Sequence, residues 1–236
     1  MSADGWLALV ATPIGNLEDI TLRALRTLKE ADLIAAEDTR KTRKLCSHYN
    51  IKTELTSYHQ HNEYQKTPRL LDRVEEGTRI AVVSNAGTPA VSDPGYLVVQ
   101  KALERGIEPC VIPGVSALTF AVPACGLPVD KFTFLGFPPR KQGSRRNFFR
   151  ELCGQEMTYF VLVSVHRISD VLVDASEVLG PRTKMALVRE ATKVHEEVIR
   201  GTAEDLVRAD RERGGEWRGE FVLAIDARTS RPRNRG

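Results

Sequence analysis

Residues 82–95 place side chains that could bind a ligand directly after a run of β-branched residues. Gly87 and Gly95 permit backbone geometry and a close approach that a side chain would block. Hydroxyl groups in the same loop belong to Ser84, Thr88 and Ser92. An open α/β sheet presents small-molecule sites in this way, at the carboxyl end of a strand. The pattern predicts a ligand-binding loop without naming the ligand.

Other predicted strands also end in polar clusters, which are residues 12–16, 37–40, 59–63 and 113–117. If the strands are parallel, all of these ends lie along one edge of the sheet and converge on one site, which favours binding over separate turns. Taken singly, each cluster is also explained by turn or cap chemistry. For Glu37, Asp38 and Arg40 the simpler interpretation is a local ion pair that shapes the loop.

Known signatures of other chemistry are missing from the sequence. The His, Cys and Asp residues do not have the spacing of a metal site, so we expect no metal. The sequence also lacks the glycine-rich phosphate loop that ends in Lys and Ser or Thr, and the nucleophile elbow of serine hydrolases.

The elements that must position these residues alternate between strand and helix. In the first half we expect strands at residues 6–11, 32–36, 55–58, 80–84 and 108–112, with helices between them. Such alternation predicts a largely parallel, twisted α/β sheet covered by helices. In the second half we expect strands at 132–137, 159–165, 184–189 and 220–226, and helices at 145–152, 168–179 and 203–211.

We expect the domain boundary near Gly114. This gives an N-terminal α/β lobe at residues 1–113 and a C-terminal α/β lobe at 114–227, with a cleft between them. Residues 228–236 are polar and basic, and we expect a disordered tail.

Charge and composition bound the class of partner. The chain has 236 residues, 42% of them hydrophobic, and a net charge of only +3, yet its basic residues are clustered at 40–44, 140–150 and 228–235. Each cluster alone is explained by a solvated face. The three together favour a polyanionic partner.

Cysteine usage and hydropathy favour a cytoplasmic protein. The four cysteines have no paired spacing and are typical of reduced cytosolic thiols. Residues 109–129 carry no charge and are long enough to span a bilayer. Their prolines and glycines would break a lipid-exposed helix, so we expect no membrane insertion.

A series of short motifs runs in order along residues 7–226. In the first half these are residues 10–20 (VATPIGNLEDI), 35–40 (AAEDTR), 61–63 (HNE), 86–89 (AGTP), 92–96 (SDPGY) and 113–114 (PG). In the second half they are 126–128 (GLP), 136–137 (GF), 166–167 (HR), 189–190 (RE), 192–193 (TK) and 219–220 (GE). Any one of them is weak, but together they resemble the family of ribosomal RNA small subunit methyltransferase I.

The resemblance implies the tetrapyrrole methylase-like fold, in which two αβα lobes hold S-adenosylmethionine in the cleft between them. It also implies a homodimer and methyl transfer to the ribose 2′-oxygen of a cytidine in small-subunit ribosomal RNA, either free or in the 30S subunit. Two departures stand out: Asn85 occupies a position where the family usually has Asp, and Val163 one where it has an acid. The alternatives are a tetrapyrrole methyltransferase of the same fold and a non-catalytic RNA-binding relative.

Roles follow from this resemblance for residues at the strand ends and in the basic clusters. The cofactor is expected to contact backbone and small residues, namely Pro13, Gly15, Ser84, Asn85, Ala86, Gly87, Thr88, Ser116 and Ala117. The candidate catalytic carboxylates are Glu37, Asp38 and Asp93, with His59 as a further candidate base. Residues expected to bind the RNA are Arg40, His59, Asn62, Arg140, Lys141, Arg145 and Arg146.

Overall fold

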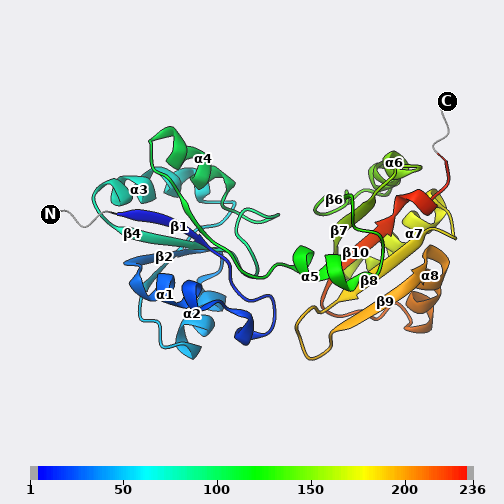
Figure 1. Cartoon of the computed structure of the whole chain (residues 1–236), viewed down its shortest axis with the longest axis horizontal. Helices are drawn as coiled ribbons and strands as arrows, with labels where there is room; N and C mark the ends of the chain where they lie inside the picture. Colours follow the sequence, from blue (N-terminus) through cyan, green and yellow to red (C-terminus); the bar gives the residue numbers. More distant parts are fainter. Residues whose placement is uncertain (1–4, 233–236) are drawn as a thin grey trace. The chain divides into compact units, whose positions relative to one another are not determined.

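The computed structural model describes residues 5–232. Contacts between Cα atoms divide the chain into unit 1, residues 1–116, and unit 2, residues 117–236. This division falls three residues after the boundary expected from the sequence, because Pro113 to Ser116 remain packed with the first unit. In each unit, helices cover both faces of a β-sheet (Figure 1).

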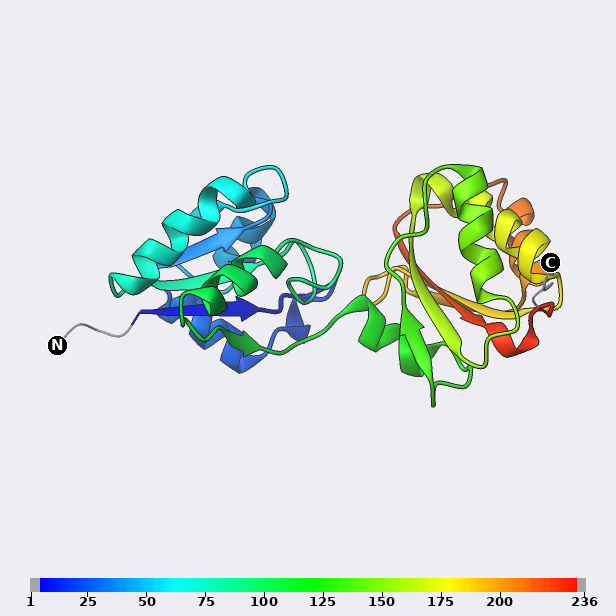
Figure 2. The ribbon, with the colours of Figure 1, turned by 90° about the horizontal axis from the view of Figure 1, so that it is seen from above.

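Unit 1 is built on a parallel sheet with the strand order β3-β2-β4-β1-β5. Its strands are β1 (Trp6–Val10), β2 (Leu33–Ala36), β3 (Glu54–Ser57), β4 (Arg79–Val83) and β5 (Cys110–Ile112). Figure 2 shows the strand arrows of this unit pointing the same way. The predicted parallel sheet is therefore confirmed for the first half of the chain.

Helices α1 (Leu22–Glu30) and α2 (Thr39–His48) pack on one face of this sheet. Helices α3 (Glu63–Glu75) and α4 (Tyr96–Glu104) pack on the other face. The short 3-10 helix η1 (Leu17–Asp19) precedes α1. Local chemistry sets where the helices start, since the Thr21 hydroxyl caps α1 by accepting a hydrogen bond from the backbone N–H of Ala24.

Unit 2 has a mixed sheet with the order β6-β7-β10-β8-β9, in which β6 and β7 are parallel and the other pairs are antiparallel. Its strands are β6 (Phe132–Phe134), β7 (Thr158–Ser164), β8 (Lys184–Arg189), β9 (Glu197–Thr202) and β10 (Glu220–Asp226). Strand β9 was not predicted. It is a half-exposed edge strand with few apolar side chains, so it lacks the hydrophobic signal of a buried strand.

Helices α6 (Gln142–Leu152), α7 (Ile168–Leu179) and α8 (Ala203–Glu212) cover one face of this second sheet. Helix α5 (Ala117–Ala124) covers the other face. The short 3-10 helices η2 (Val165–Arg167) and η3 (Ala227–Thr229) follow β7 and β10. None of the helices within residues 5–232 is both long enough and apolar enough to cross a membrane.

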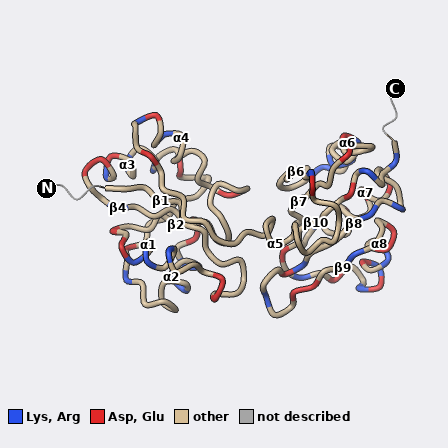
Figure 3. Tube along the Cα trace, viewed as in Figure 1, with Lys and Arg blue, Asp and Glu red and all other residues tan. Residues whose placement is uncertain are grey.

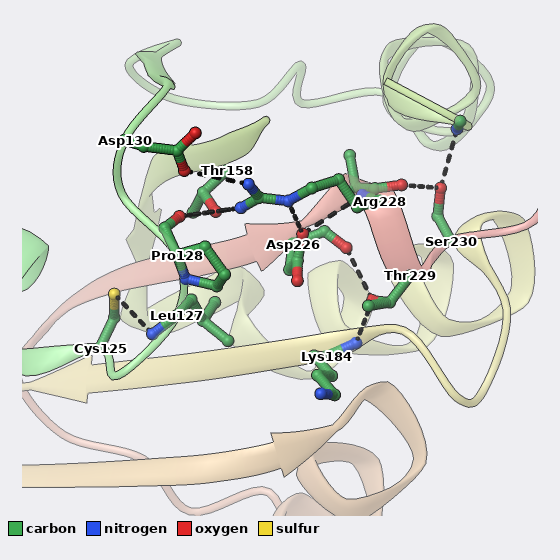
Figure 4. Close-up of polar contacts among 12 residues, drawn as sticks. Cys125, Leu127, Pro128, Asp130, Thr158, Lys184, Asp226, Arg228, Thr229 and Ser230 are labelled. Atoms are coloured by element: carbon green, nitrogen blue, oxygen red, sulfur yellow. Dashed lines mark hydrogen bonds and ion pairs between the residues drawn. The ribbon is translucent and has the colours of Figure 1, made fainter. Parts of the chain in front are cut away.

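The sequence predicts a disordered tail from residue 228 onward, but Arg228 is held in place by several hydrogen bonds. Its guanidinium donates to the buried Asp226 carboxylate at 2.7 Å and to the Pro128 carbonyl at 2.9 Å (Figure 4). It also contacts Thr158 Oγ1 at 2.9 Å and the Asp130 carboxylate at 3.1 Å. These partners fix η3 on the sheet, so ordered structure continues past residue 228. Arg233 and Arg235 lie outside the described residues.

We predict that Arg228→Ala destabilises unit 2, because it leaves the Asp226 carboxylate, which is 4% exposed, without its cation. A buried group that loses its partner costs about 1–3 kcal/mol or more. Urea unfolding measures this loss of stability. The exposed Arg182, changed to Ala, is the control and should alter stability by less than about 0.5 kcal/mol. Equal stability of the two variants would contradict the prediction.

Candidate functional site at the strand ends of unit 1

The carboxyl ends of all the unit 1 strands lie along one edge of the sheet, because every strand pair in it is parallel. The polar clusters predicted from the sequence follow these ends. Contacts given below join the loops after β1, β2, β4 and β5 to one another, whereas the 59–63 cluster makes its side-chain contacts within its own loop. The predicted convergence on a single edge is therefore confirmed.

The loops after β1 and β4 are joined by a pair of backbone hydrogen bonds. Thr12 donates its N–H to the Gly87 carbonyl at 2.9 Å, and Gly87 donates back to the Thr12 carbonyl at 2.8 Å. Gly87 has φ +77°, a conformation that side chains disfavour. A Cβ there would lie 3.4 Å from Ile14 Cγ2 and 3.7 Å from Ser116 Cα, so a side chain would fill the space between three loops.

Two hydroxyl groups close the loop after β4. The Thr88 hydroxyl donates to the Val115 carbonyl at 3.4 Å, which links this loop to the segment after β5. The buried Ser84 hydroxyl donates to the Ala86 carbonyl at 3.2 Å. Ser116 is the last residue of unit 1, and Ala117 begins unit 2. Contacts thus connect the loops of small residues expected around a cofactor, from Thr12 through Gly87 and Thr88 to the segment that ends at Ser116. Beside them, Pro13 is half-buried and Gly15 is exposed.

Glu37 joins the end of β2 to the loop after β4. Its carboxylate accepts a hydrogen bond from the backbone N–H of Asn85 at 3.0 Å, and its own N–H donates to the Val83 carbonyl at 3.2 Å. Glu37 and Asn85 are both half-buried. A partly buried carboxylate is therefore fixed beside the glycine-rich loop, where it can accept a proton or a hydrogen bond from a bound molecule.

The segment that carries Asp93 has an uncommon backbone. Ala90 and Ser92 adopt positive φ angles of 68° and 63°, and Gly95 has φ 139°. Positive φ is rare for residues with a side chain and collects at binding and catalytic sites. Asp93 is half-buried in this segment, immediately before the helix that starts with Tyr96.

Hydrogen bonds around Asn62 fix the tautomer of His59. The Asn62 amide oxygen accepts from the His59 backbone N–H at 2.8 Å. The amide nitrogen must then be the group that faces Ser57 and the His59 ring, donating to Nε2 at 3.2 Å. Nε2 is the acceptor, so Nδ1 carries the proton in the neutral ring. His59 is thereby arranged as a hydrogen-bond donor and not as a base.

Two predicted site residues turn out to shape the loops. The Asn62 side chain bonds to Ser57 and His59 and so shapes its own loop, while its role in RNA binding stays a prediction. Asp38 caps α2 by accepting from the Arg40 backbone N–H at 2.9 Å, and it also pairs with the Arg40 guanidinium at 3.0 Å. These hydrogen bonds lower the pKa of Asp38 to about 2, which makes it a weak base.

Buried side-chain atoms without a hydrogen-bond partner point to a ligand at this edge. Across residues 5–232 there are four such atoms: Thr12 Oγ1, Asp19 Oδ2, His59 Nδ1 and Asn85 Oδ1. Each lies in a segment that follows a strand of unit 1. An unpaired buried polar group costs about 1–3 kcal/mol, so a site that a polar ligand completes explains their position. Acceptor oxygens beside small residues fit a polar cofactor such as S-adenosylmethionine.

No group of three or more His, Cys, Asp or Glu side chains that could hold a metal ion occurs in the described part of the chain. Unit 2 also has an open pocket of about 390 Å³ lined by Arg228 and by the exposed Asp130, Lys131 and Glu156. Because the pocket's Arg228 and Asp130 already pair with each other, we place the site at the strand ends of unit 1.

The basic clusters differ in how much charge they present. Helix α2 is rich in Lys and Arg (Figure 3). Its exposed cations are Arg40, Lys41, Arg43 and Lys44. In unit 2, Arg140 and Lys141 are exposed, but Arg145 is only 2% exposed. Its guanidinium pairs with the buried Asp174 at 2.6 Å, and Arg146 pairs with the same carboxylate at 2.8 Å.

The assignment of Arg145 to RNA binding is therefore wrong. The helical period turns Arg145 to the same buried face as Phe149 and Leu152. Arg146 is partly exposed, but its charge is shared between Asp174 and Glu177.

Motifs of the second half build a turn between β8 and β9. Lys193 donates to Glu190 at 2.8 Å and to Glu220 at 2.9 Å. Gly219 has φ +103°, which disfavours a side chain, and a Cβ there would displace the Glu190 carboxylate, 2.3 Å away. Val163, at a position where the family resemblance implies an acid, is 3% exposed in the core of unit 2.

Comparison with known proteins places the chain in a family. The family model for tetrapyrrole (corrin/porphyrin) methylases matches residues 7–207. A protein named ribosomal RNA small subunit methyltransferase I from Halalkalibacterium halodurans is 49% identical over 222 residues, which cover 94% of this chain and 76% of the relative. The protein of the same name from Synechocystis is 43% identical, with 97% and 81% covered. The chain belongs to the ribosomal RNA small subunit methyltransferase I family.

Solved structures agree on the fold. A uroporphyrin-III C-methyltransferase from Thermus thermophilus has a TM-score of 0.67 at 24% identity and covers 95% of this chain and 96% of its own. A cobalt precorrin-4 methyltransferase has a TM-score of 0.66 at 19% identity, with 95% and 96% covered. The predicted tetrapyrrole methylase-like fold is confirmed.

Sequence reasoning missed some features of the site. The Thr12 hydroxyl was part of a predicted cluster, but its lack of a partner depends on how the β1 loop meets the β4 loop. Tyr64 and Tyr96, which are strongly exposed at the starts of α3 and α4, gave no periodic signal. Their helical position would have placed them at the same edge.

We predict that Arg40→Ala raises the pKa of Asp38 from about 2 toward its ordinary value of 3.8, because the side-chain hydrogen bond is lost. Carboxyl carbon shifts in an NMR titration measure it. Arg43→Ala, on the same helix, should leave the pKa near 2. The folded pKa is depressed, so the pair stabilises the protein fully above pH 3.8 and progressively less as the pH falls toward 2. An unchanged pKa in Arg40→Ala would show that the backbone alone sets it.

Proposed function

We propose that this protein transfers a methyl group from S-adenosylmethionine to the ribose 2′-oxygen of a cytidine in small-subunit ribosomal RNA. The observation that carries the proposal is the ring of loops around Gly87, with its unpartnered polar atoms, in a chain that is 40–49% identical to proteins of that name. The tetrapyrrole enzymes of the same fold named above are at most 24% identical, so the porphyrin alternative is not favoured.

When bound, S-adenosylmethionine supplies an electrophilic methyl group on a sulfonium sulfur. The small residues at the strand ends are proposed to hold it, and these are Pro13, Gly15, Ser84, Asn85, Ala86, Gly87, Thr88, Ser116 and Ala117. The unpartnered oxygens of Thr12 and Asn85 offer hydrogen-bond acceptors beside Gly87. Fixing both reactants in line accounts for roughly 7–11 kcal/mol of barrier lowering in well-oriented systems.

Glu37 is the carboxylate we propose to accept the proton of the ribose hydroxyl. Asp38 is held by Arg40 and His59 carries its proton on Nδ1, which leaves Glu37 and Asp93 among the predicted candidates. Glu37 is tied through Asn85 to the loop expected to hold the cofactor. Tyr58, nearby at the end of β3, is not a competing base, because burial raises its pKa to about 12.

The RNA is proposed to contact the exposed cations of α2, which start at Arg40, and the exposed Arg140 and Lys141 of unit 2. His59 Nδ1 is suited to donate to an oxygen of the substrate. Contacts to phosphates give affinity that depends on salt and carries little sequence information. The choice of target is therefore expected to depend on RNA shape, in free RNA or in the 30S subunit.

We further propose that the protein is a cytoplasmic homodimer, as the family resemblance implies. The free thiols of Cys46, Cys110, Cys125 and Cys153 are consistent with a reducing compartment. Light scattering on the purified protein measures its mass directly.

We predict that the purified protein transfers methyl groups from labelled S-adenosylmethionine to small-subunit particles taken from cells that lack it. The label should map to a cytidine 2′-oxygen. Glu37→Gln should lower kcat by roughly 10²–10⁴-fold. The amide oxygen of Gln can still accept the Asn85 N–H, so the loop and cofactor binding are kept. Porphyrin that is labelled in place of RNA would overturn the proposed function. An unchanged kcat in Glu37→Gln would show that Glu37 does not accept the proton of the ribose hydroxyl.

We predict that Asn85→Asp leaves the affinity for S-adenosylmethionine unchanged or raises it, because a carboxylate there would offset the sulfonium charge. Asn85→Ala should weaken binding roughly two- to tenfold through loss of one hydrogen bond. Calorimetry measures both, and the exposed Gln100, changed to Ala, is the control. A large loss in Asn85→Asp would show that the site is adapted to the amide. No heat with the natural chain would favour a non-catalytic RNA-binding role.

A further inference from the structure

Two tyrosines stand exposed at the edge of unit 1 that carries the candidate site. Tyr64 is the second residue of α3, and Tyr96 is the first residue of α4. Their side chains are 78% and 70% exposed. Both helices follow parallel strands and pack together on one face of the sheet, so both start at the edge where the strands end. The two rings therefore flank the same row of loops.

The fold does not require these two rings. Helix α3 buries Thr67, Leu70, Leu71 and Val74, and helix α4 buries Val98 and Ala102. Tyr64 and Tyr96 lie outside this core. The other tyrosines of unit 1 differ, because Tyr49 donates its hydroxyl to the Leu17 carbonyl at 2.6 Å and Tyr58 meets Thr67 at 2.9 Å. Tyr64 and Tyr96 can therefore be changed without opening a cavity in this core.

A third ring extends this surface. His61 is exposed in the loop before α3, with its ring centroid 5.9 Å from that of His59. Exposed planar rings of Tyr and His are the groups on which proteins stack unpaired nucleobases. The exposed cations of α2 begin at the end of β2, the strand next to β3. One edge thus combines flat rings with positive charge, which suits single-stranded RNA.

We propose that Tyr64 and Tyr96 stack on unpaired bases that neighbour the target nucleotide. The inference rests on the proposed function, since it takes RNA as the substrate, and it adds that the RNA binds with its bases splayed out of a helix. Stacking on both rings holds the strand across the loops that contain Glu37 and Gly87. Paired bases hide their faces from the rings, so the surface discriminates against duplex RNA.

The test compares Tyr64→Ala and Tyr96→Ala with Tyr64→Phe and Tyr96→Phe, which keep the ring. The probe is a fluorescent single-stranded oligocytidine, free or annealed to its complement, and fluorescence anisotropy gives Kd. Each Ala variant should weaken single-strand binding roughly fivefold to hundredfold. The Phe variants should bind as the natural chain does. Leu103→Ala is the matched control, because Leu103 is 51% exposed at the far end of α4.

Ala variants that bind the single strand normally would overturn the inference, and so would natural protein that prefers the duplex. A change in mass by light scattering in the Ala variants would show that a second copy of the chain covers the rings, which also overturns it. Calorimetry with S-adenosylmethionine should be unchanged in all variants. The inference alone fails when the natural chain methylates small-subunit RNA and the Ala variants match it in KM. Natural protein that binds the cofactor but neither binds nor methylates RNA removes the proposed function itself.

Discussion

The two backbone hydrogen bonds between Thr12 and Gly87 hold together the loops on which the site of unit 1 depends. They follow from the parallel sheet, which places the ends of β1 and β4 side by side. They also place position 87 at a positive φ of 77°, a conformation that disfavours a side chain and favours glycine. The surrounding contacts of Thr88 and Glu37 extend this join to the ends of β5 and β2.

This arrangement concentrates unsatisfied polarity in one place. Within the described residues, the buried side-chain atoms that lack a partner all follow strands of unit 1, whereas polar groups of unit 2 such as Asp174, Asp210 and Asp226 are paired. Proteins leave buried polar groups unpaired rarely, since each one costs stability. Unit 1 thus gives up some stability where a polar ligand can restore it, and unit 2 does not.

The cationic clusters show how burial decides the use of a charge. Lys41, Arg43 and Lys44 of α2 are turned to solvent, so their charge is available to a polyanion, whereas Arg40 shares its charge with Asp38. In the cluster of unit 2, Arg145 instead joins α6 to α7 through Asp174. Removing either partner of such a pair strands a buried charge, which explains why an Arg in a basic run can be structural.

The sequence by itself determined the alternation of strands and helices, the parallel first sheet and the polar clusters at its edge. These features depend on local hydrophobic period and on glycine and proline positions, which act within a few residues. The run of matching motifs added the family. Strand β9 was not predicted because an exposed edge strand carries few apolar side chains.

Only the tertiary structure decided which polar side chains form hydrogen bonds within the loops and which can still bind a ligand. Asn62 and Asp38 form hydrogen bonds with their neighbours, and Arg145 pairs with a carboxylate 29 residues away. Thr12 and Asn85 keep unpartnered oxygens because of how separate loops pack around Gly87. A side chain's partners depend on segments that are distant in the sequence, so spacing along the chain cannot show whether a charge or hydroxyl is already satisfied.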